Sequence, residues 1–188
     1  VAKDFVDFSF TPSDSKQFHK LVTTQTPQEE AAVVRIPQWS HYDVLQKDVV
    51  VLLDAVQDPG NVGSIVSLCS AFDASLLLLE SADITSPKVV RASVGALFTT
   101  PWIQMNFSEY VEMKQLLSEH TTYRLERRRN AVSFDAAVLK KPLILVAGSE
   151  GHGIRKEIEG ISVSLTQSMN LESLNVTHAL AIGLYELY

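Results

Sequence analysis

The chain has 188 residues, 46% of them hydrophobic, and a formal net charge of −6. Length and hydrophobic content fit one domain with a substantial core and a short appendage, and they leave little room for two full domains. The acidic balance argues against a protein coated in basic charge for nonspecific nucleic-acid binding, so any contact with nucleic acid must be local.

The apolar runs of the sequence are short. The longest, such as 49–53 and 75–79, fall far below the roughly 20 residues needed to span a bilayer, and residues 1–10 do not read as a signal peptide. The single Cys69 has no partner for an internal disulfide, and none of the histidines has a metal-ligand partner at helical or hairpin spacing. We therefore expect a soluble, cytoplasmic protein with no membrane association and no metal site.

Residues 1–46 are polar and predicted to be irregular. Turn signals at 11–15 and 24–27 surround one short apolar run at 31–36. This composition indicates the end of another unit followed by a linker. From residue 47 onward apolar runs alternate with helical patterns, which predicts the main domain over 47–188.

Unbroken apolar runs bounded by Gly, Pro or Asp predict buried strands in the main domain. These strands are expected near 49–54, 75–80, 101–105, 142–147 and 161–165. Helices are expected at roughly 62–72, 87–98 with Ser86 as N-cap and Pro87 first, 109–119 with Ser108 as N-cap, and 173–188. The alternation predicts an α/β fold, a parallel sheet with helices on both faces, whose ligands bind at the carboxyl ends of the strands.

Three loops that follow predicted strands have unusual compositions. The first, 54–64, contains Pro, two Gly and Asn61, which either contacts a ligand or belongs to an ordinary capped strand-to-helix loop. The second, 147–153, has three glycines, which favour close approach of the backbone to a ligand, and it also holds His152. The third, 167–176, is rich in amides and hydroxyls that either line a site or cap the last helix.

One basic cluster stands out in an otherwise acidic chain. Arg124, Arg127, Arg128 and Arg129 occur within six residues, interrupted by Leu125 and Glu126. Such a cluster either holds a phosphate backbone electrostatically or forms a solvated charged loop.

In this order, the three loops resemble the signature motifs of the SpoU, or TrmH-like, RNA methyltransferases. Residues 57–65 (QDPGNVGSI) resemble the first motif, 145–154 the second, and 172–176 (ESLNV) the third. Residues 86–97 resemble a further segment of the family. The resemblance covers about 48–188 with four matches in the correct order.

This resemblance implies an RNA ribose 2'-O-methyltransferase. The implied enzyme is a homodimer that transfers a methyl group from S-adenosylmethionine to tRNA or rRNA, and its C-terminal part forms a deep trefoil knot, an exception to the rule that chains avoid knots. Residues 19–37 resemble the end of an RNA-binding domain that precedes the catalytic domain in relatives, so we interpret 1–46 as its remnant and a linker.

The resemblance also implies the site residues. The expected catalytic site consists of Asn61, Glu150, Ser173 and Asn175. The expected cofactor-binding residues are Val146, Ala147, Gly148, Glu150, Gly151, Leu165 and Leu174. RNA contacts are expected at Arg91, Arg124, Arg127 and Arg128.

The sequence departs from the family pattern at two places. Ser67 stands six residues after Asn61, where the family has an arginine, and 165–167 (LTQ) stands where Ile-Pro-Met is usual. A serine cannot provide the bidentate hold of a guanidinium on phosphate. Either Arg91 or an arginine among 124–129 of the partner subunit substitutes, or the chain is a catalytically weakened homologue that binds RNA or a protein partner.

A nucleotide-dependent oxidoreductase is an alternative from another class. Glu80, at the end of the second predicted strand, would then bind a ribose. The loop after the first strand lacks the Gly-rich fingerprint that this function requires, which disfavours it.

Overall fold

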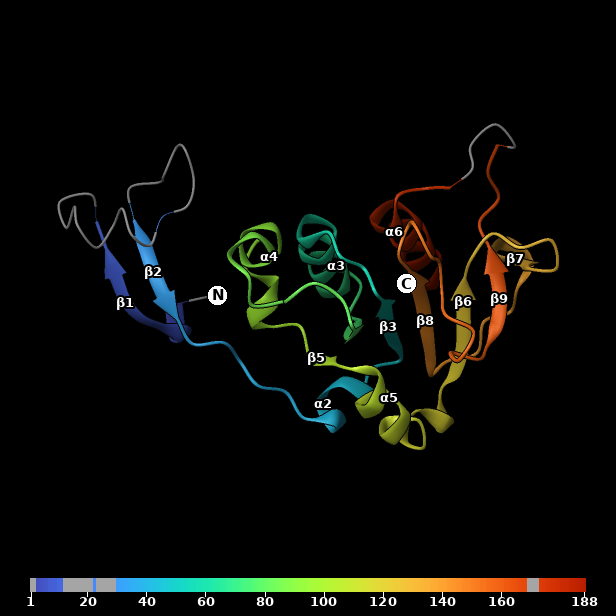
Figure 1. The fold of residues 1–188 in the computed structure, drawn as a ribbon, viewed down its shortest axis with the longest axis horizontal. Coiled ribbons are helices and arrows are strands. Elements are labelled where there is room, and N and C mark those ends of the chain that lie inside the picture. Colours follow the sequence, from blue (N-terminus) through green and yellow to red (C-terminus); the bar gives the residue numbers. More distant parts are fainter. Residues whose placement is uncertain (1–2, 12–21, 23–29, 169–172) are drawn as a thin grey trace. The chain divides into compact units, whose positions relative to one another are not determined.

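The computed structural model of the protein describes residues 3–11, 22, 30–168 and 173–188 (Figure 1). They fall into two compact units, divided between Gln38 and Trp39. In the smaller unit, η1 (Lys3–Phe5) leads into β1 (Val6–Phe10), which pairs antiparallel with β2 (Ala31–Val34). The prediction of an irregular segment is therefore wrong here, while most of the predicted turns at 11–15 and 24–27 lie outside the described residues.

The larger unit is built on a parallel sheet of seven strands, in the order β5-β4-β3-β8-β6-β9-β7. The strands are β3 (Val49–Asp54), β4 (Ser75–Leu79), β5 (Trp102–Met105), β6 (Thr121–Leu125), β7 (Val132–Ser133), β8 (Leu143–Gly148) and β9 (Ile161–Ser164). All five predicted strands are present, within one or two residues of their expected bounds. The predicted α/β class and parallel sheet are confirmed.

Strands β6 and β7 were not predicted. β6 reads Thr-Thr-Tyr-Arg-Leu, so it has no unbroken apolar run, and Arg124 sits in its interior with 5% of its surface exposed. β7 is only two residues long. A buried arginine needs hydrogen-bond partners that the local sequence does not reveal, and these are described with the site below.

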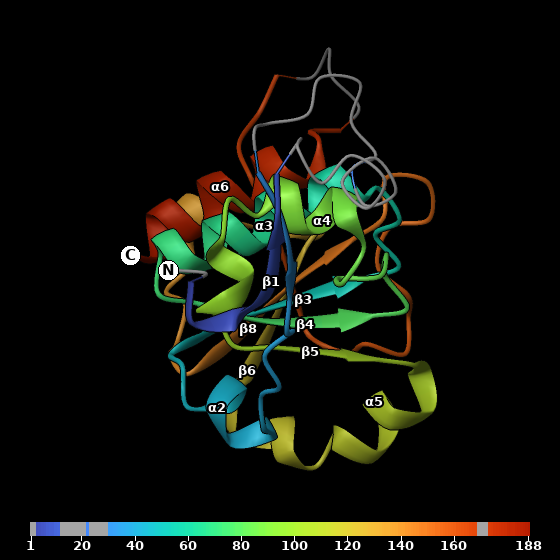
Figure 2. The ribbon, with the colours of Figure 1, turned by 90° about the vertical axis from the view of Figure 1, so that its left-hand side faces the viewer.

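Helices cover both faces of the sheet (Figures 1 and 2). On one face lie α3 (Pro59–Ala71), α4 (Pro87–Ala92) and α6 (Val176–Leu187), and on the other lie α2 (His41–Leu45) and α5 (Phe107–Met113). The shorter 3-10 helices are η3 (Ala96–Phe98), η4 (Leu116–Glu119) and η5 (Phe134–Ala136). No helix in the described part of the chain has the length and apolar character that crossing a bilayer requires.

Two predicted helices end earlier than expected, and the predicted N-cap of the second is wrong. The first begins as predicted, with Ser86 at the N-cap position and Pro87 as the first helical residue, although the Ser86 side chain makes no capping hydrogen bond. It was expected to reach residue 98 but stops after Ala92, because Val94 and Gly95 both have positive φ. The helix expected at 109–119 begins at Phe107 and ends at Met113. Its cap is a reciprocal box in which the Asn106 side chain accepts from the Glu109 N–H and the Glu109 carboxylate accepts from the Asn106 N–H.

Helix α2 belongs with the larger unit, which begins at Trp39. A capping box between Ser40 and Asp43 starts the helix. The hydroxyl of Ser75, buried at the start of β4, donates to the carbonyl of Val44 at 2.7 Å. Val44 itself is fully buried, so this short helix is tied to the sheet.

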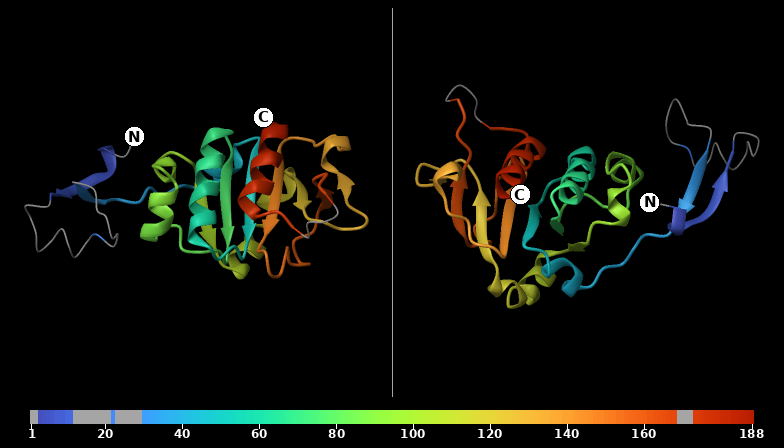
Figure 3. Two further views of the ribbon diagram at one scale, coloured as in Figure 1. Left: turned by 90° about the horizontal axis from the view of Figure 1, so that it is seen from above. Right: turned by 180° about the vertical axis from the view of Figure 1, so that it is seen from behind.

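Helix α3 packs between α4 and α6, which lie beside it on the same face (Figure 3). Gly63 permits the close approach of α4, because a Cβ built on Gly63 would lie 2.5 Å from the Ala92 Cβ and 2.7 Å from the Val89 carbonyl oxygen. This packing fixes the helix that begins with Asn61 against the sheet.

Substituting Gly63→Ala should therefore destabilise the protein by about 1 to 3 kcal/mol, because the clash outweighs the higher helix propensity of alanine. Urea unfolding would measure the loss. Gly151→Ala is the matched control, since a Cβ there meets nothing within 4 Å and its φ is not positive. Equal effects of the two substitutions would contradict this account of the α3–α4 contact.

Candidate functional site

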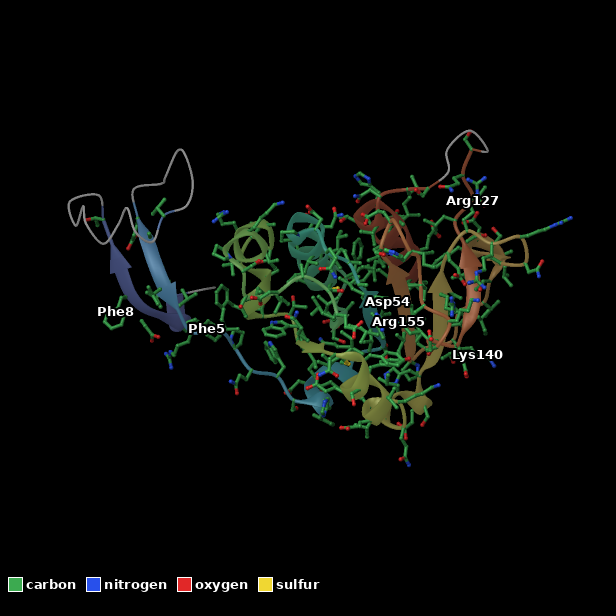
Figure 4. The ribbon with its side chains drawn as sticks, in the orientation of Figure 1. Phe5, Phe8, Asp54, Arg127, Lys140 and Arg155 are labelled. Atoms are coloured by element: carbon green, nitrogen blue, oxygen red, sulfur yellow. The ribbon has the colours of Figure 1, made fainter. Side chains whose placement is uncertain are left out.

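A pocket of about 370 Å³ lies at the carboxyl ends of β6, β8 and β9. Residues from four stretches of the chain line it. These stretches are 125–128, 147–154, 164–167 and 173–179. The three strands are neighbours in the sheet, so the loops that leave them converge, and Figure 4 shows Arg127 on the loop after β6. Two of the three loops singled out in the sequence thus form one pocket.

The wall combines apolar and polar groups, as small-molecule sites usually do, and the volume lies within the ~300–1,000 Å³ typical of such sites. The apolar part consists of Leu125, Ala147, Ile154, Leu165, Leu174, Val176 and Ala179. The polar and charged part includes Glu126, Arg127, Arg128, Ser149, Glu150, His152, Gln167 and Ser173. Such a wall can hold an apolar ring and a charged group together.

Most of the residues predicted to bind the cofactor are in this wall: Ala147, Gly148, Glu150, Leu165 and Leu174. Two are placed differently. Val146 is fully buried and packs in the core cluster, and Gly151 is exposed; neither belongs to the described residues that form the wall.

Gly148 also permits a close approach within the chain. A Cβ on Gly148 would lie 2.2 Å from the carbonyl carbon and oxygen of Gly153, so the close approach is to the chain's own loop. That loop folds back on itself, because the Gly153 N–H donates to the Ser149 carbonyl at 2.8 Å, and Gly153 has a φ of +67°. The second loop is therefore a tight turn that presents Glu150 and His152 to the pocket.

Three predicted site residues from distant parts of the sequence meet beside the pocket. The Asn61 side-chain amide donates to Glu150 at 3.0 Å, and the Asn175 amide donates to the Asn61 oxygen at 3.2 Å. The Thr177 hydroxyl donates to the same oxygen at 3.4 Å. The three motif loops are thus joined by one polar cluster, which we call the amide cluster (Asn61, Glu150, Asn175 and Thr177).

In the third loop, Asn175 caps the last helix and Ser173 lines the pocket, the two roles that the sequence left open. The Asn175 side-chain oxygen accepts from the Thr177 N–H at 2.9 Å, so Asn175 caps α6 while its amide group serves the amide cluster. Ser173 is exposed and lines the pocket. Glu172, which belongs to the same motif, lies outside the described residues.

An ion-pair chain that was not predicted anchors the second loop. The Arg155 N–H and its Nε each donate to the Asp54 carboxylate at 2.7 Å, and a terminal nitrogen of Arg155 donates to Glu80 at 2.8 Å. The side chain of Asp54 is only 2% exposed, and Figure 4 shows it beside Arg155. A carboxylate at the end of a buried strand requires a charged or hydrogen-bonding partner. Asp54 was therefore the sequence feature that could have indicated this ion pair.

Glu80 is engaged in this chain rather than presented to a ligand. The hydrogen bond from Arg155 lowers the pKa of Glu80, an effect that partial burial opposes and the nearby positive charge supports. The Phe107 N–H also donates to Glu80, at 3.3 Å. This placement removes the ribose-binding role that the oxidoreductase alternative required.

The structure corrects the prediction that Arg124 contacts RNA. Its guanidinium is buried and donates to the carbonyls of Ile154, Arg155 and Ile158 and to the carboxylate of Glu126. Arg124 therefore holds segment 154–158 against β6 from one side, while Arg155 holds it to β3 from the other.

The other predicted RNA contacts are accessible. Arg91, Arg127 and Arg128 are exposed, and the last two line the pocket. Ser67 lies on α3 and is partly buried. Among the described residues, no group of three His, Cys, Asp or Glu is arranged to hold a metal ion.

The larger unit also resembles known proteins in sequence. Residues 48–185 match the SpoU rRNA Methylase family. The chain is 31% identical over 175 residues to the 23S rRNA (guanosine(2553)-2'-O)-methyltransferase RlmP of Bacillus subtilis, covering 90% of this chain and 68% of the relative. It is 28% identical over 176 residues to an uncharacterised tRNA/rRNA methyltransferase of Synechocystis sp., of which it spans 62% and which covers 89% of this chain.

Solved structures agree with these matches. An AdoMet-bound rRNA methyltransferase from Sinorhizobium meliloti superposes with a TM-score of 0.79 at 25% identity, covering 91% of this chain and 68% of that one. A putative RNA methyltransferase of the TrmH family from Porphyromonas gingivalis gives 0.76 at 34% identity, covering 90% and 69%. The chain therefore spans roughly two thirds of the length of its relatives.

Replacing Arg155 with methionine should destabilise the protein by about 2 to 3 kcal/mol, because Asp54 stays buried without its charged partner while the exposed fraction of Arg155 moderates the loss. Urea unfolding would measure it. Lys47→Met is the control, because its partner Asp73 is 77% exposed and such a pair contributes about 0 to 1 kcal/mol. A loss no larger than that of the control would contradict the anchoring role.

Acid should weaken this anchor. Because the folded-state pKa of Glu80 is lowered, its contribution is present above its unfolded pKa and is lost as the pH falls through the folded value. The free energy of unfolding should therefore decrease from about pH 6 to about pH 3, and less steeply in Glu80→Gln. Glu112→Gln, on the exposed side of α5, controls for the lost charge; identical pH profiles in the two variants would refute the assignment.

Proposed function

Because the chain belongs to the SpoU rRNA Methylase family, we propose that it transfers a methyl group from S-adenosylmethionine to a ribose 2'-hydroxyl of tRNA or rRNA. The observation that carries the proposal is the amide cluster, which joins all three motif loops at the rim of a pocket of suitable size. The Bacillus subtilis relative is named as a 2'-O-methyltransferase of 23S rRNA, and the Sinorhizobium meliloti neighbour is an AdoMet-bound rRNA methyltransferase.

The pocket fits S-adenosylmethionine by the chemistry of its wall. Leu165, Leu174 and Ala147 offer an apolar surface for an adenine ring, and exposed backbone of the second loop offers hydrogen bonds to it. Glu150 places negative charge where a sulfonium or an ammonium group would bind. We assign the cofactor to this pocket, with Ala147, Gly148, Glu150, Leu165 and Leu174 in contact with it.

When bound, S-adenosylmethionine supplies an electrophilic methyl group whose transfer to the ribose oxygen breaks the carbon–sulfur bond and releases the hydroxyl proton. The protein must align the hydroxyl and accept that proton. Glu150 is the pocket carboxylate suited to this, because Glu126 already accepts hydrogen bonds from three side chains. Asn61 fixes Glu150, and Asn175 fixes Asn61 in turn.

Ser67 stands where the family has an arginine, so this chain lacks the cation that usually follows the first-motif asparagine. We infer that an arginine of the pocket wall, Arg127 or Arg128, contacts the RNA phosphate instead. The second candidate function is a homologue that binds cofactor and RNA without turnover, and the specific observation in its favour is Ser67. The two functions differ in methyl transfer and agree in binding.

We also propose the architecture that the family implies. The C-terminal segment would thread through a loop as a deep trefoil knot, supported by the insertion of β9 between β6 and β7 and by the packing of α6 on α3. A homodimer is supported by exposed apolar side chains on α6, such as Ile182 and Tyr185. Residues 1–46 would be the remnant of an RNA-binding domain with its linker.

Calorimetric titration with S-adenosylmethionine and with its demethylated product should give one site per subunit with a micromolar dissociation constant. Leu174→Asp should abolish binding, because it places a charge in the apolar part of the wall. Leu116→Asp is the control, since Leu116 is 52% exposed on η4 and is not among the described residues that line the pocket. No binding of either ligand to the wild-type protein would contradict the cofactor assignment.

Incubation with labelled S-adenosylmethionine and unmodified 23S rRNA or tRNA transcripts should yield 2'-O-methylnucleosides, identified by mass spectrometry after nuclease digestion. Asn61→Ala should lower kcat by roughly 10- to 100-fold while the cofactor affinity changes little, because Asn61 orients Glu150 and is not in the pocket wall. Methylated bases would contradict the ribose target. Cofactor binding without transfer, with activity restored in Ser67→Arg, would establish the weakened homologue.

A further inference from the structure

Glu126 is the meeting point of three side chains in the wall of the pocket. Its Oε1 accepts from the Arg124 Nε at 2.9 Å and from the Ser162 hydroxyl at 2.6 Å. Its Oε2 accepts from the second Arg124 donor at 3.3 Å and forms an ion pair with the Arg128 Nε at 3.0 Å. Both carboxylate oxygens are therefore used, and Glu126 is not available as a ligand for a bound molecule.

The orientation of Glu126 is fixed by its buried partner Arg124. Its side chain is 12% exposed, and Arg124, which bonds to both of its oxygens, is itself held by backbone carbonyls of segment 154–158. Burial alone would raise the pKa of Glu126, but the hydrogen bonds from Arg124 and Ser162 and the guanidinium charges outweigh it, so the pKa lies below its ordinary value. Glu126 is thus a rigid, charged acceptor at neutral pH.

Arg128 is held at one end and accessible at the other. Its side chain is 53% exposed, although its Nε is paired with Glu126. An ion pair this exposed contributes little to stability. A guanidinium has five N–H donors in a fixed fork, so fixing the Nε directs the remaining donors without consuming them. The pair therefore serves orientation more than stability.

We propose that Glu126 is a positioning residue that holds Arg128 in the orientation in which it contacts an RNA phosphate beside the target ribose. The inference rests on the proposed function. Arg128 lines the same pocket as Glu150, which the amide cluster links to Asn61. A held guanidinium binds phosphate better than a mobile one, because less side-chain freedom is lost on binding.

The proposal and simple electrostatics predict opposite changes in RNA affinity for Glu126→Gln. Glu126→Gln removes a negative charge from the RNA-facing surface, so charge alone predicts tighter RNA binding. Loss of orientation predicts the opposite, an affinity about 3- to 10-fold weaker. Arg128→Ala should weaken binding by about 10-fold and reduce the slope of log affinity against log salt by about 1.

The experiment is filter binding of an unmodified 23S rRNA transcript over a range of potassium chloride concentrations. Arg129→Ala is the matched control. It removes one positive charge from the neighbouring residue, whose side chain is exposed and is not among the described residues that line the pocket. We expect Arg129→Ala to leave the slope unchanged. Equal losses in Arg128→Ala and Arg129→Ala would overturn the proposal.

The double variant separates positioning from a structural effect. If Glu126 acts through Arg128, then Glu126→Gln should cause no further loss when Arg128 is already alanine. If Glu126→Gln instead disturbs the fold through Arg124, the loss persists in that background, and the proposal is wrong. Tighter RNA binding by Glu126→Gln would also overturn it.

Failure of the proposed function is distinguishable from failure of this inference. The comparison of variants measures RNA binding and needs no turnover, so absence of methyl transfer by the wild-type protein contradicts only the proposed function. Transfer by the wild-type protein, combined with equal salt slopes for wild type and Arg128→Ala, contradicts only the role of Arg128.

Discussion

Asp54 ends the interior strand β3 with its carboxylate almost completely withdrawn from water, and burial of an unpaired charge is strongly unfavourable. Arg155 resolves this cost with its backbone N–H and its guanidinium together. Because Arg155 lies two residues after Gly153, where the tight turn of the second loop closes, neutralising Asp54 also fixes where that loop runs. The pocket wall, the position of Glu150 and the reach of the amide cluster all depend on this pairing.

The site is assembled from segments that are more than one hundred residues apart in the chain, such as Asn61 and Asn175. A parallel sheet brings the carboxyl ends of its strands to one edge, so the loops leaving β3, β8 and β9 can meet there. Short polar side chains then join them. Amides suit this task because each both donates and accepts, which allows Asn61 to bridge Glu150 and Asn175.

The sequence predicted those parts of the fold whose cause is local. Uninterrupted apolar runs identified five strands, and the motif loops identified Asn61, Glu150 and Asn175, which do come together. Errors occurred where tertiary partners decide. β6 was missed because Arg124 interrupts its apolar pattern, and the same burial removes Arg124 from the predicted RNA contacts. Helix α4 ends because Val94 has a positive φ. The sequence does not predict this, because a β-branched residue such as valine rarely adopts that conformation.

Arg124 recognises segment 154–158 through main-chain carbonyls, which every amino acid possesses. Side chains in that segment are consequently released from one of the constraints that usually restrict residues around a binding pocket. Sequence drift there would leave this attachment intact as long as the backbone keeps its path. A chain that keeps Arg124, Arg155 and the buried Ile154 and Ile158 can therefore vary at the other positions of this segment and still present the same loop.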